Sequence, residues 1–290
     1  SLPGHPRNHC KSRLIFYRRD ASVSFYQNTP TIEVFFDSHC HLDRIDLAGF
    51  NNNFDQLLKT IEQDAVTRML CIGVNLESFA AMHQRIGAYG HIFCTAGVHP
   101  DYEDVQEPSV EQLCELAQHD KVVAIGETGL DYFHQSGELD WQRNRFITHI
   151  EAARECGLPL VIHTRDARED TLTLLRRHRA QDVGGVLHCF TEDWSMARAA
   201  IELGFYISIS GIVTFQQAQN VRDMASQIPL ERLLIETDAP WLSPAPYRGK
   251  TNHPGRVRLV AEKLAEIRGE SVEQLARETF NNANNLFGLN

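Results

Sequence analysis

From residue 34 onward, short apolar runs rich in β-branched residues alternate with longer stretches whose apolar residues recur every three or four positions. The short runs are predicted strands and the longer stretches are predicted amphipathic helices. We expect strands at residues 34–37, 68–74, 92–98, 122–127, 160–163, 185–188, 206–210 and 233–238. Strands that alternate with helices pair in parallel through right-handed crossovers. The pattern therefore predicts an α/β protein.

The number of strand–helix units distinguishes between two α/β architectures. Eight units in about 250 residues favour a closed barrel over an open doubly wound sheet, and the near-continuous apolar runs are typical of parallel strands covered on both faces. The glycine-rich phosphate turn of dinucleotide-binding sheets is missing from the sequence. We expect a single (β/α)8 TIM barrel over residues 34–290. Residues 256–288 would supply the eighth helix and an extra C-terminal helix.

Residues 1–33 differ from the rest of the chain. They carry five Lys and Arg against two acids, and they show neither hydrophobic periodicity nor the apolar segment of a signal peptide. We expect a poorly ordered N-terminal extension without a function of its own.

Composition and charge limit the classes of function. A hydrophobic content of 42% and a charged content of 23% are ordinary for a globular protein, and no apolar run is long enough to span a membrane. The seven cysteines are dispersed and contain no C-x-x-C pair, which argues against a disulfide framework and fits a reducing cytoplasm. The net charge of -10 argues against tight, non-specific binding of nucleic acid. A polyanionic substrate would need local basic groups or bound cations.

Ionisable residues gather at the carboxyl ends of the predicted strands. All these ends face one mouth in a barrel, so residues far apart in the sequence converge there. The residues in this position are His39, His41, His99, Glu127, His163, His188 and Asp238. Each alone would more often be a hydrogen-bonded structural residue, but their convergence indicates a metal site. In extended backbone His39 and His41 share a face, and Cys40 points away.

The donor atoms indicate the kind of metal. Imidazole nitrogens combined with carboxylates suit Zn or Mn, whereas Mg prefers oxygen ligands. The set exceeds the four ligands of one tetrahedral site, so two ions are plausible. Two ions about 4 Å apart share a bridging ligand, and the carboxylate of Glu127 can serve.

Six short motifs, in order along the chain, resemble those of the TatD family of metal-dependent deoxyribonucleases within the amidohydrolase superfamily. They are "DSHCHLD" (37–43), "GVHP" (97–100), "IGETGLD" (125–131), "VIHTRDA" (161–167), "LHCFT" (187–191) and "IETDAP" (235–240). The resemblance extends from about residue 34 to the C-terminus. It implies a TIM barrel that hydrolyses DNA with the help of divalent metals.

The resemblance also implies roles for individual residues. It assigns two metal sites that share Glu127, the first completed by His39, His41 and Asp238 and the second by His163 and His188. By the same resemblance His99 would contact the substrate phosphate. The histidines favour a borderline ion such as Zn or Mn, while the resemblance suggests activity with Mg.

We therefore expect a hydrolase that cleaves DNA phosphodiesters, acting as an exonuclease, through a water activated by two metals. Asp238 is expected to take the proton of that water as the general base. Arg165, Arg248 and Lys250 lie in loops at the mouth and are candidate phosphate contacts, and Trp241 is available to stack on a base. DNA would be a transient substrate, and we expect no membrane association and no stable protein partner.

A second function stays open on the sequence. The same two-metal mouth suits a small-molecule ester, lactone or amide, and the acidic chain favours a small substrate. The stretch at residues 239–255 is rich in Pro and Gly and bears cations, which suits an extended anionic ligand. We rank the nuclease first.

Overall fold

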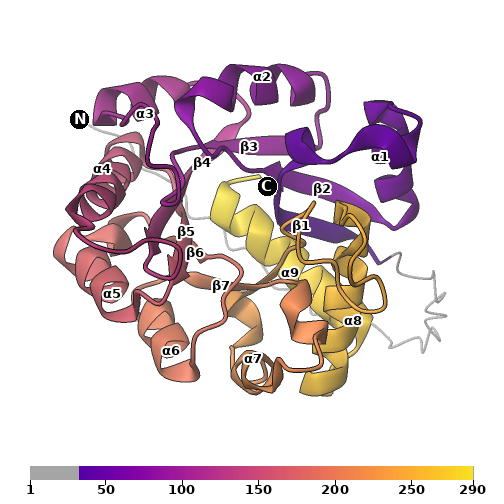
Figure 1. Ribbon diagram of the computed structural model, residues 1–290. Coiled ribbons are helices and arrows are strands. Elements are labelled where there is room, and N and C mark those ends of the chain that lie inside the picture. Colours follow the sequence, from indigo (N-terminus) through magenta and orange to yellow (C-terminus); the bar gives the residue numbers. More distant parts are fainter. Residues whose placement is uncertain (1–32, 290) are drawn as a thin grey trace, which may run out of the picture. The chain divides into compact units, whose positions relative to one another are not determined.

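The computed structural model describes residues 33–289, and these residues form a (β/α)8 barrel (Figure 1). The extension predicted at residues 1–33 lies outside the described residues except for Glu33. The parallel strands follow one another around the barrel in chain order: β1 (Phe35–Cys40), β2 (Val66–Cys71), β3 (Ile92–Ala96), β4 (Val122–Asp131), β5 (Leu160–Arg165), β6 (Gly185–Leu187), β7 (Tyr206–Ile209) and β8 (Leu233–Ile235). The predicted fold is confirmed.

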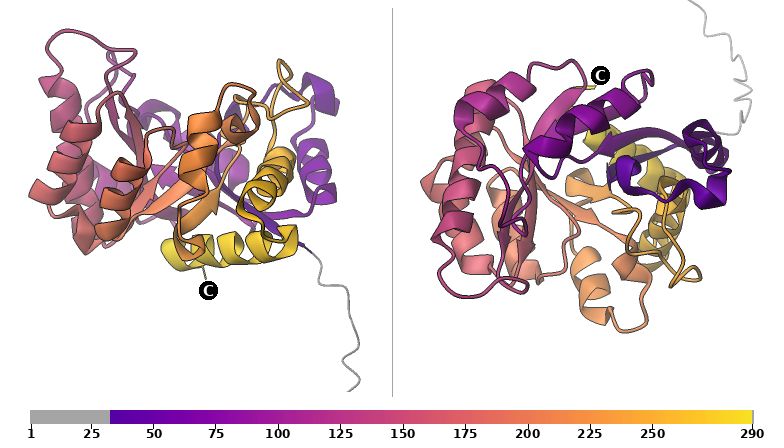
Figure 2. Two further views of the ribbon diagram at one scale, coloured as in Figure 1. Left: turned by 90° about the horizontal axis from the view of Figure 1, so that it is seen from below. Right: turned by 45° about the horizontal axis from the view of Figure 1, so that its top comes forward.

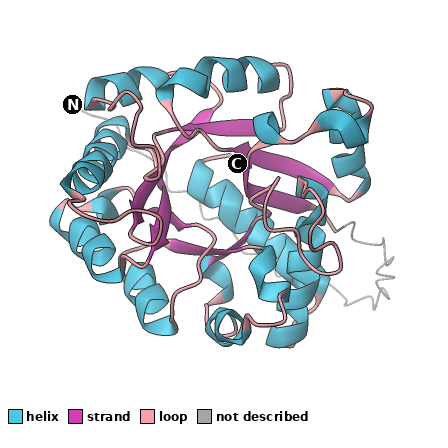
Figure 3. Ribbon diagram, in the orientation of Figure 1, coloured by secondary structure: helices cyan, strands magenta, loops and turns pink. Residues whose placement is uncertain are grey.

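Helices α1 to α8 surround the strands as an outer layer, and α9 lies across one end of the barrel (Figure 3). They are α1 (Phe54–Gln63), α2 (Leu76–Ile86), α3 (Val110–Leu116), α4 (Asp140–Cys156), α5 (Arg168–Arg177), α6 (Trp194–Glu202), α7 (Gln219–Ala225), α8 (Val257–Arg268) and the extra helix α9 (Val272–Phe287). None of the helices within residues 33–289 is both long enough and apolar enough to cross a membrane.

The barrel closes between β1 and β8. The backbone N–H of Asp238 donates to the carbonyl of His39 at 2.9 Å. The buried carboxylate of Asp37 accepts hydrogen bonds from the backbone N–H of Thr237 at 2.9 Å and from its hydroxyl at 2.5 Å. A buried carboxylate must find such donors within the protein, so these bonds hold the first and last strands together. These bonds place candidate metal ligands from the first strand and from the end of the last strand side by side.

β1 and β4 end three and four residues later than predicted, so His39 lies within its strand rather than after it, and Glu127 lies inside its strand rather than at the end. At the segment that contains His39, β1 has one residue more than the paired segment of β2. At Glu127, β4 has one residue more than β5. A bulge of this kind interrupts the alternation of side chains and changes the direction of one of them. Both bulges therefore occur at predicted metal ligands.

Helix α9 closes the end of the barrel opposite the mouth (Figure 2). Its residues Ala283 and Phe287 join the apolar cluster of β-strand side chains that includes Phe36. The ring of Phe36 lies 6.2 Å from that of Phe287. The amide of Asn282 donates to the carbonyl of Leu233 at 2.9 Å, at the amino end of β8. Helix α9 therefore covers the strands at this end of the barrel.

Replacing Phe287 by Ala should lower the free energy of unfolding by about 3–5 kcal/mol, because a buried ring that fills the barrel end is lost. Urea unfolding followed by circular dichroism measures the change. Asn281→Ala, an exposed position on the same helix, is the matched control and should change stability by less than about 0.5 kcal/mol. Similar small losses in both variants would show that α9 does not complete the core.

Candidate active site

The carboxyl ends of the strands enclose a cavity of about 800 Å³. Most of the predicted site residues line it: His41, His99, Glu127, His163, His188 and Asp238. His39 is fully buried beside them, stacked on His188 with a distance of 3.7 Å between ring centroids. The structure therefore brings together the seven histidines and carboxylates that the sequence placed at the strand ends.

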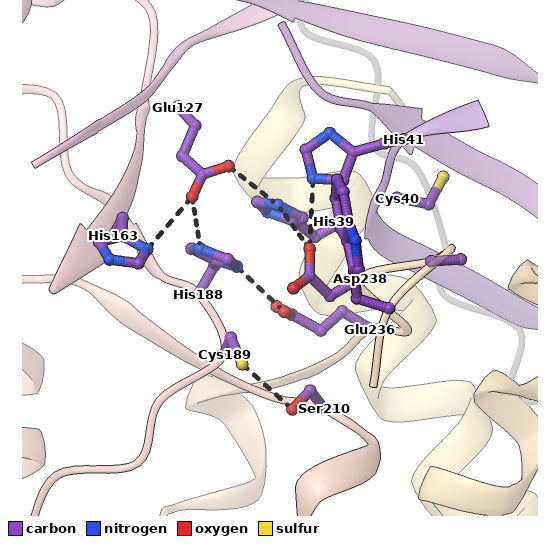
Figure 4. Close-up of polar contacts among 12 residues, drawn as sticks. His39, Cys40, His41, Glu127, His163, His188, Cys189, Ser210, Glu236 and Asp238 are labelled. Carbon is purple, nitrogen blue, oxygen red and sulfur yellow. Dashed lines mark hydrogen bonds and ion pairs between the residues drawn. The ribbon is translucent and has the colours of Figure 1, made fainter. Parts of the chain in front are cut away.

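Glu127 lies at the centre of this group (Figure 4). Its Oε2 lies 3.3 Å from Nε2 of His39. Its Oε1 lies 2.7 Å from Nε2 of His188, 3.4 Å from Nδ1 of His163 and 3.1 Å from Nε2 of His99. Burial alone would raise the pKa of Glu127, but the surrounding imidazoles outweigh it and hold the pKa well below its ordinary value. The two oxygens of one ionised carboxylate thus face two different sets of nitrogens.

Asp238 completes the β1 side of the cavity. Its Oδ1 lies 3.2 Å from Nε2 of His41 and 3.5 Å from Nε2 of His39. Burial opposes ionisation here too, but the hydrogen bond from His41 and the nearby imidazoles lower the pKa of Asp238. The side chain keeps 17% of its surface exposed and lines the cavity. Asp238 is therefore an ionised carboxylate that a substrate can reach.

In His163 and His188, the ring nitrogen that points away from Glu127 contacts a second carboxylate. Nε2 of His163 donates to Asp131 at 2.8 Å, and Nδ1 of His188 donates to Glu236 at 3.1 Å. Both carboxylates are fully buried. Each bond holds the ring so that its other nitrogen faces Glu127, where a metal ion can take the place of the proton that the carboxylate attracts.

His99 has the opposite arrangement. Its Nδ1 accepts a hydrogen bond from the backbone N–H of Asp101 at 3.0 Å, so its proton sits on Nε2. That nitrogen faces Oε1 of Glu127 at 3.1 Å as a donor. The geometry supports a role for His99 other than metal ligation, and its contact with a substrate phosphate stays a prediction.

The donor set fits a metal centre. Among the described residues, both ring nitrogens of His39, Nδ1 of His41 and Nε2 of His188 are buried without a hydrogen-bond partner. Buried polar atoms without partners are rare in folded proteins. His39 and His188 form one group with Glu127, and His39 and His41 form another with Asp238; within each group the possible ligand atoms lie within 4.8 Å of one another. Imidazole and carboxylate together bind divalent ions of the Zn or Mn type, and the carboxylates also admit Mg.

The sequence analysis assigned no role to Asp131 or Glu236, although both stand in the quoted motifs "IGETGLD" and "IETDAP". Each motif contained two acids, and periodicity alone could not tell which acid faces the cavity and which supports a histidine. Their position near a strand end was the one indication of this role in the sequence, since a carboxylate close to a predicted metal ligand often orients that ligand.

Helix α4 supports the site with a polar face that the sequence analysis also missed. Gln142, Arg145 and His149 are buried along one side of this helix. Gln142 accepts the backbone N–H of Asp131 at 2.8 Å, and Arg145 donates to the carbonyl of His99 at 2.8 Å. His149 Nε2 accepts the N–H of the residue before His99 at 2.9 Å. The helix therefore fixes the carboxyl ends of β3 and β4.

The two arginines predicted to contact phosphate have different positions. Arg165 lines the cavity, with its guanidinium 3.9 Å from the ring centroid of Phe133. The guanidinium of Arg248 lies 3.7 Å from the ring centroid of Phe215, and the lining residues do not include it. Arg44, which the sequence analysis did not single out, lines the cavity just after β1. A phosphate contact by Arg248 stays a prediction.

The fold and the site define a class of protein, a TIM barrel whose mouth carries a histidine- and carboxylate-rich candidate metal centre. Residues 36–288 match the family model described as TatD related DNase. The uncharacterized metal-dependent hydrolase YcfH of Escherichia coli K12 is 45% identical over 254 residues, which cover 87% of this chain and 95% of that protein. The chain belongs to the TatD family and is a metal-dependent hydrolase.

Two further comparisons agree with this assignment. A protein of Escherichia fergusonii named 3'-5' ssDNA/RNA exonuclease TatD is 35% identical over 246 residues, covering 83% of this chain and 95% of that protein. The crystal structure of YJJV, a TatD homologue from Escherichia coli K12, matches with a TM-score of 0.82 and 29% identity, covering 88% of this chain and 98% of that chain.

Glu236→Gln should weaken metal binding by about 10- to 100-fold, because the amide no longer holds the proton of His188 on Nδ1 as firmly. Isothermal titration with Mn or Zn measures the affinity. Glu231→Gln, an exposed position at the amino end of β8, is the control. Equal affinity in both variants would remove Glu236 from the support of the site.

His149 should make stability depend on pH. Burial lowers the pKa of His149 from 6.5 to about 4, so the folded protein keeps it neutral while the unfolded chain takes up a proton. Its contribution is complete above pH 6.5 and is lost as the pH falls toward 4, by up to about 1.4 kcal/mol per unit. Unfolding of the wild type and of His149→Gln between pH 4 and 7 isolates this contribution. Parallel pH curves would contradict it.

Proposed function

We propose that this hydrolase is a nuclease that cleaves phosphodiester bonds of DNA, acting as an exonuclease with two divalent metal ions. The observation that carries the proposal is the position of Glu127, whose two oxygens face separate sets of imidazoles across one cavity. A carboxylate in this position can bridge two cations, as phosphodiester-cleaving two-metal sites require. The name of the Escherichia fergusonii relative supports a nucleic-acid substrate.

The proposed ligands fall into two groups that share Glu127. His39, His41 and Asp238 would hold one ion, and His163 and His188, which both face Oε1 of Glu127, would hold the other. Bound divalent ions, whether Zn, Mn or Mg, would supply the Lewis acidity that activates a water and offsets charge on the phosphate. His99 donates to Glu127 and so orients its carboxylate between the two groups.

Asp238 is the proposed general base. It is ionised, it lines the cavity, and its Oδ1 is oriented by Nε2 of His41. A carboxylate in this state can accept the proton of the attacking water. Arg44 and Arg165 are placed to meet phosphate oxygens at the rim. Because such contacts are few, DNA binding should depend only weakly on salt concentration.

Asp238→Asn should lower the rate of DNA hydrolysis by at least about 100-fold, since the amide cannot accept the proton. The assay uses end-labelled single- and double-stranded oligonucleotides with Mg, Mn or Zn and a chelator control. Asp104→Asn, an exposed residue in a loop at the same end of the barrel, is the control. A variant that folds and retains the wild-type rate would rule out Asp238 as the base.

The same assay decides the substrate class. A panel of esters, lactones and amides is tested beside the oligonucleotides, with the same metals. If DNA is not cleaved with any metal while a small substrate is turned over, the protein is a small-molecule hydrolase instead.

A further inference from the structure

Large exposed apolar side chains concentrate at the mouth of the barrel. Among the described residues they are Phe133, Trp241 and Tyr247, with exposed fractions of 59%, 48% and 43%. Phe133 follows β4, and the other two lie in the loop after β8. Their clustering around a cavity at one end of the barrel, rather than single scattered exposure, indicates a ligand-contacting surface.

Two of the three rings are joined to the cavity. Trp241 lines it and packs edge-on against the ring of His41, with centroids 5.0 Å apart. Phe133 stacks under the guanidinium of Arg165, which also lines the cavity. Tyr247 differs, because it does not line the cavity and its ring lies beneath Arg256.

The strand order places the two cavity-linked rings on opposite sides of the mouth. β4 and β8 are four strands apart in a ring of eight, so the loops that follow them face each other across the cavity. Figure 1 shows β4 and β1, the neighbour of β8, on opposite sides of the barrel. A ligand whose phosphate reached Glu127 would extend toward both rings.

We propose that Trp241 and the stacked pair Phe133–Arg165 are two nucleobase-stacking surfaces on either side of the bound phosphate. The inference rests on the proposed nuclease function and names the part of the substrate that these residues recognise. An aromatic face stacks on any base, and a guanidinium adds a cation–π contribution. Only unpaired bases expose their faces, so the two surfaces select single-stranded ends or extruded nucleotides.

Base stacking would let an acidic protein bind a nucleic acid. A net charge of -10 disfavours the long-range attraction that usually draws nucleic acid to a protein. Two stacking surfaces beside a cationic centre supply affinity for bases without a basic groove. Specificity for a nucleic acid over other phosphodiesters then depends on the rings more than on surface charge.

The test compares a substrate with bases and one without them. Phe133→Ala and Trp241→Ala are assayed on an end-labelled single-stranded oligonucleotide and on bis(p-nitrophenyl) phosphate. Each substitution should lower kcat/KM for the oligonucleotide by about 5- to 100-fold, mainly through KM. The ratio of oligonucleotide to small-diester hydrolysis should fall at least fivefold. Phe133→Tyr and Trp241→Phe, which keep an aromatic face, should restore most of this ratio.

Tyr247→Ala is the matched control, since it removes an exposed ring from the same end of the barrel without touching the cavity. It should leave both activities unchanged. An oligonucleotide with a stable abasic analogue near the labelled end should be hydrolysed more slowly by the wild type. The alanine variants should lose less of their rate on this substrate, because they already lack the ring on which the base stacks.

The outcomes separate this inference from the proposed function. If the wild type cleaves the oligonucleotide and the alanine variants match it, the stacking surfaces are ruled out and the nuclease stands. Equal losses on both substrates would assign the rings a structural role and also overturn the inference. If the wild type hydrolyses the small diester but no oligonucleotide, the proposed nuclease function fails, and the stacking inference fails with it.

Discussion

The buried carboxylate of Glu127 is the interaction on which the rest of the site depends. A charged group with only 2% of its surface exposed would be unfavourable in the barrel unless opposite charges or donors surrounded it. Imidazoles from β1, from the β3 and β6 ends and from β5 meet this requirement. The bulge in β4 aims the carboxylate at them. Buried Asp131 and Glu236 then hold two of these rings in place.

Much of this arrangement could be predicted from the sequence, because parallel strands are long apolar runs and their carboxyl ends share one mouth. The positions at which β1 and β4 end could not be predicted. Backbone pairing continues in them through polar residues such as Ser38 and Thr128 after the apolar pattern stops. The β-bulges in these strands cannot be recognised from the alternation of apolar and polar residues in the sequence. They depend on strand pairing, which a single sequence does not show.

The supporting residues were harder still to predict. Gln142, Arg145 and His149 lie on a helix that periodicity identifies, yet polar residues on such a helix usually face water. Their partners are backbone groups of β3 and β4, which only the packed structure brings near. The placement of Arg248 against Phe215 likewise depends on a loop conformation that composition does not determine.

If the carboxylate of Glu127 joins two metal sites, the number of ions bound per chain depends on this one residue. Elemental analysis of the purified protein after saturation with Mn and removal of free ion should give two ions per wild-type chain. For Glu127→Gln we expect fewer than one ion per chain, because both sites lose their shared ligand. One ion per wild-type chain, or two ions retained by the folded variant, would contradict this shared role of Glu127.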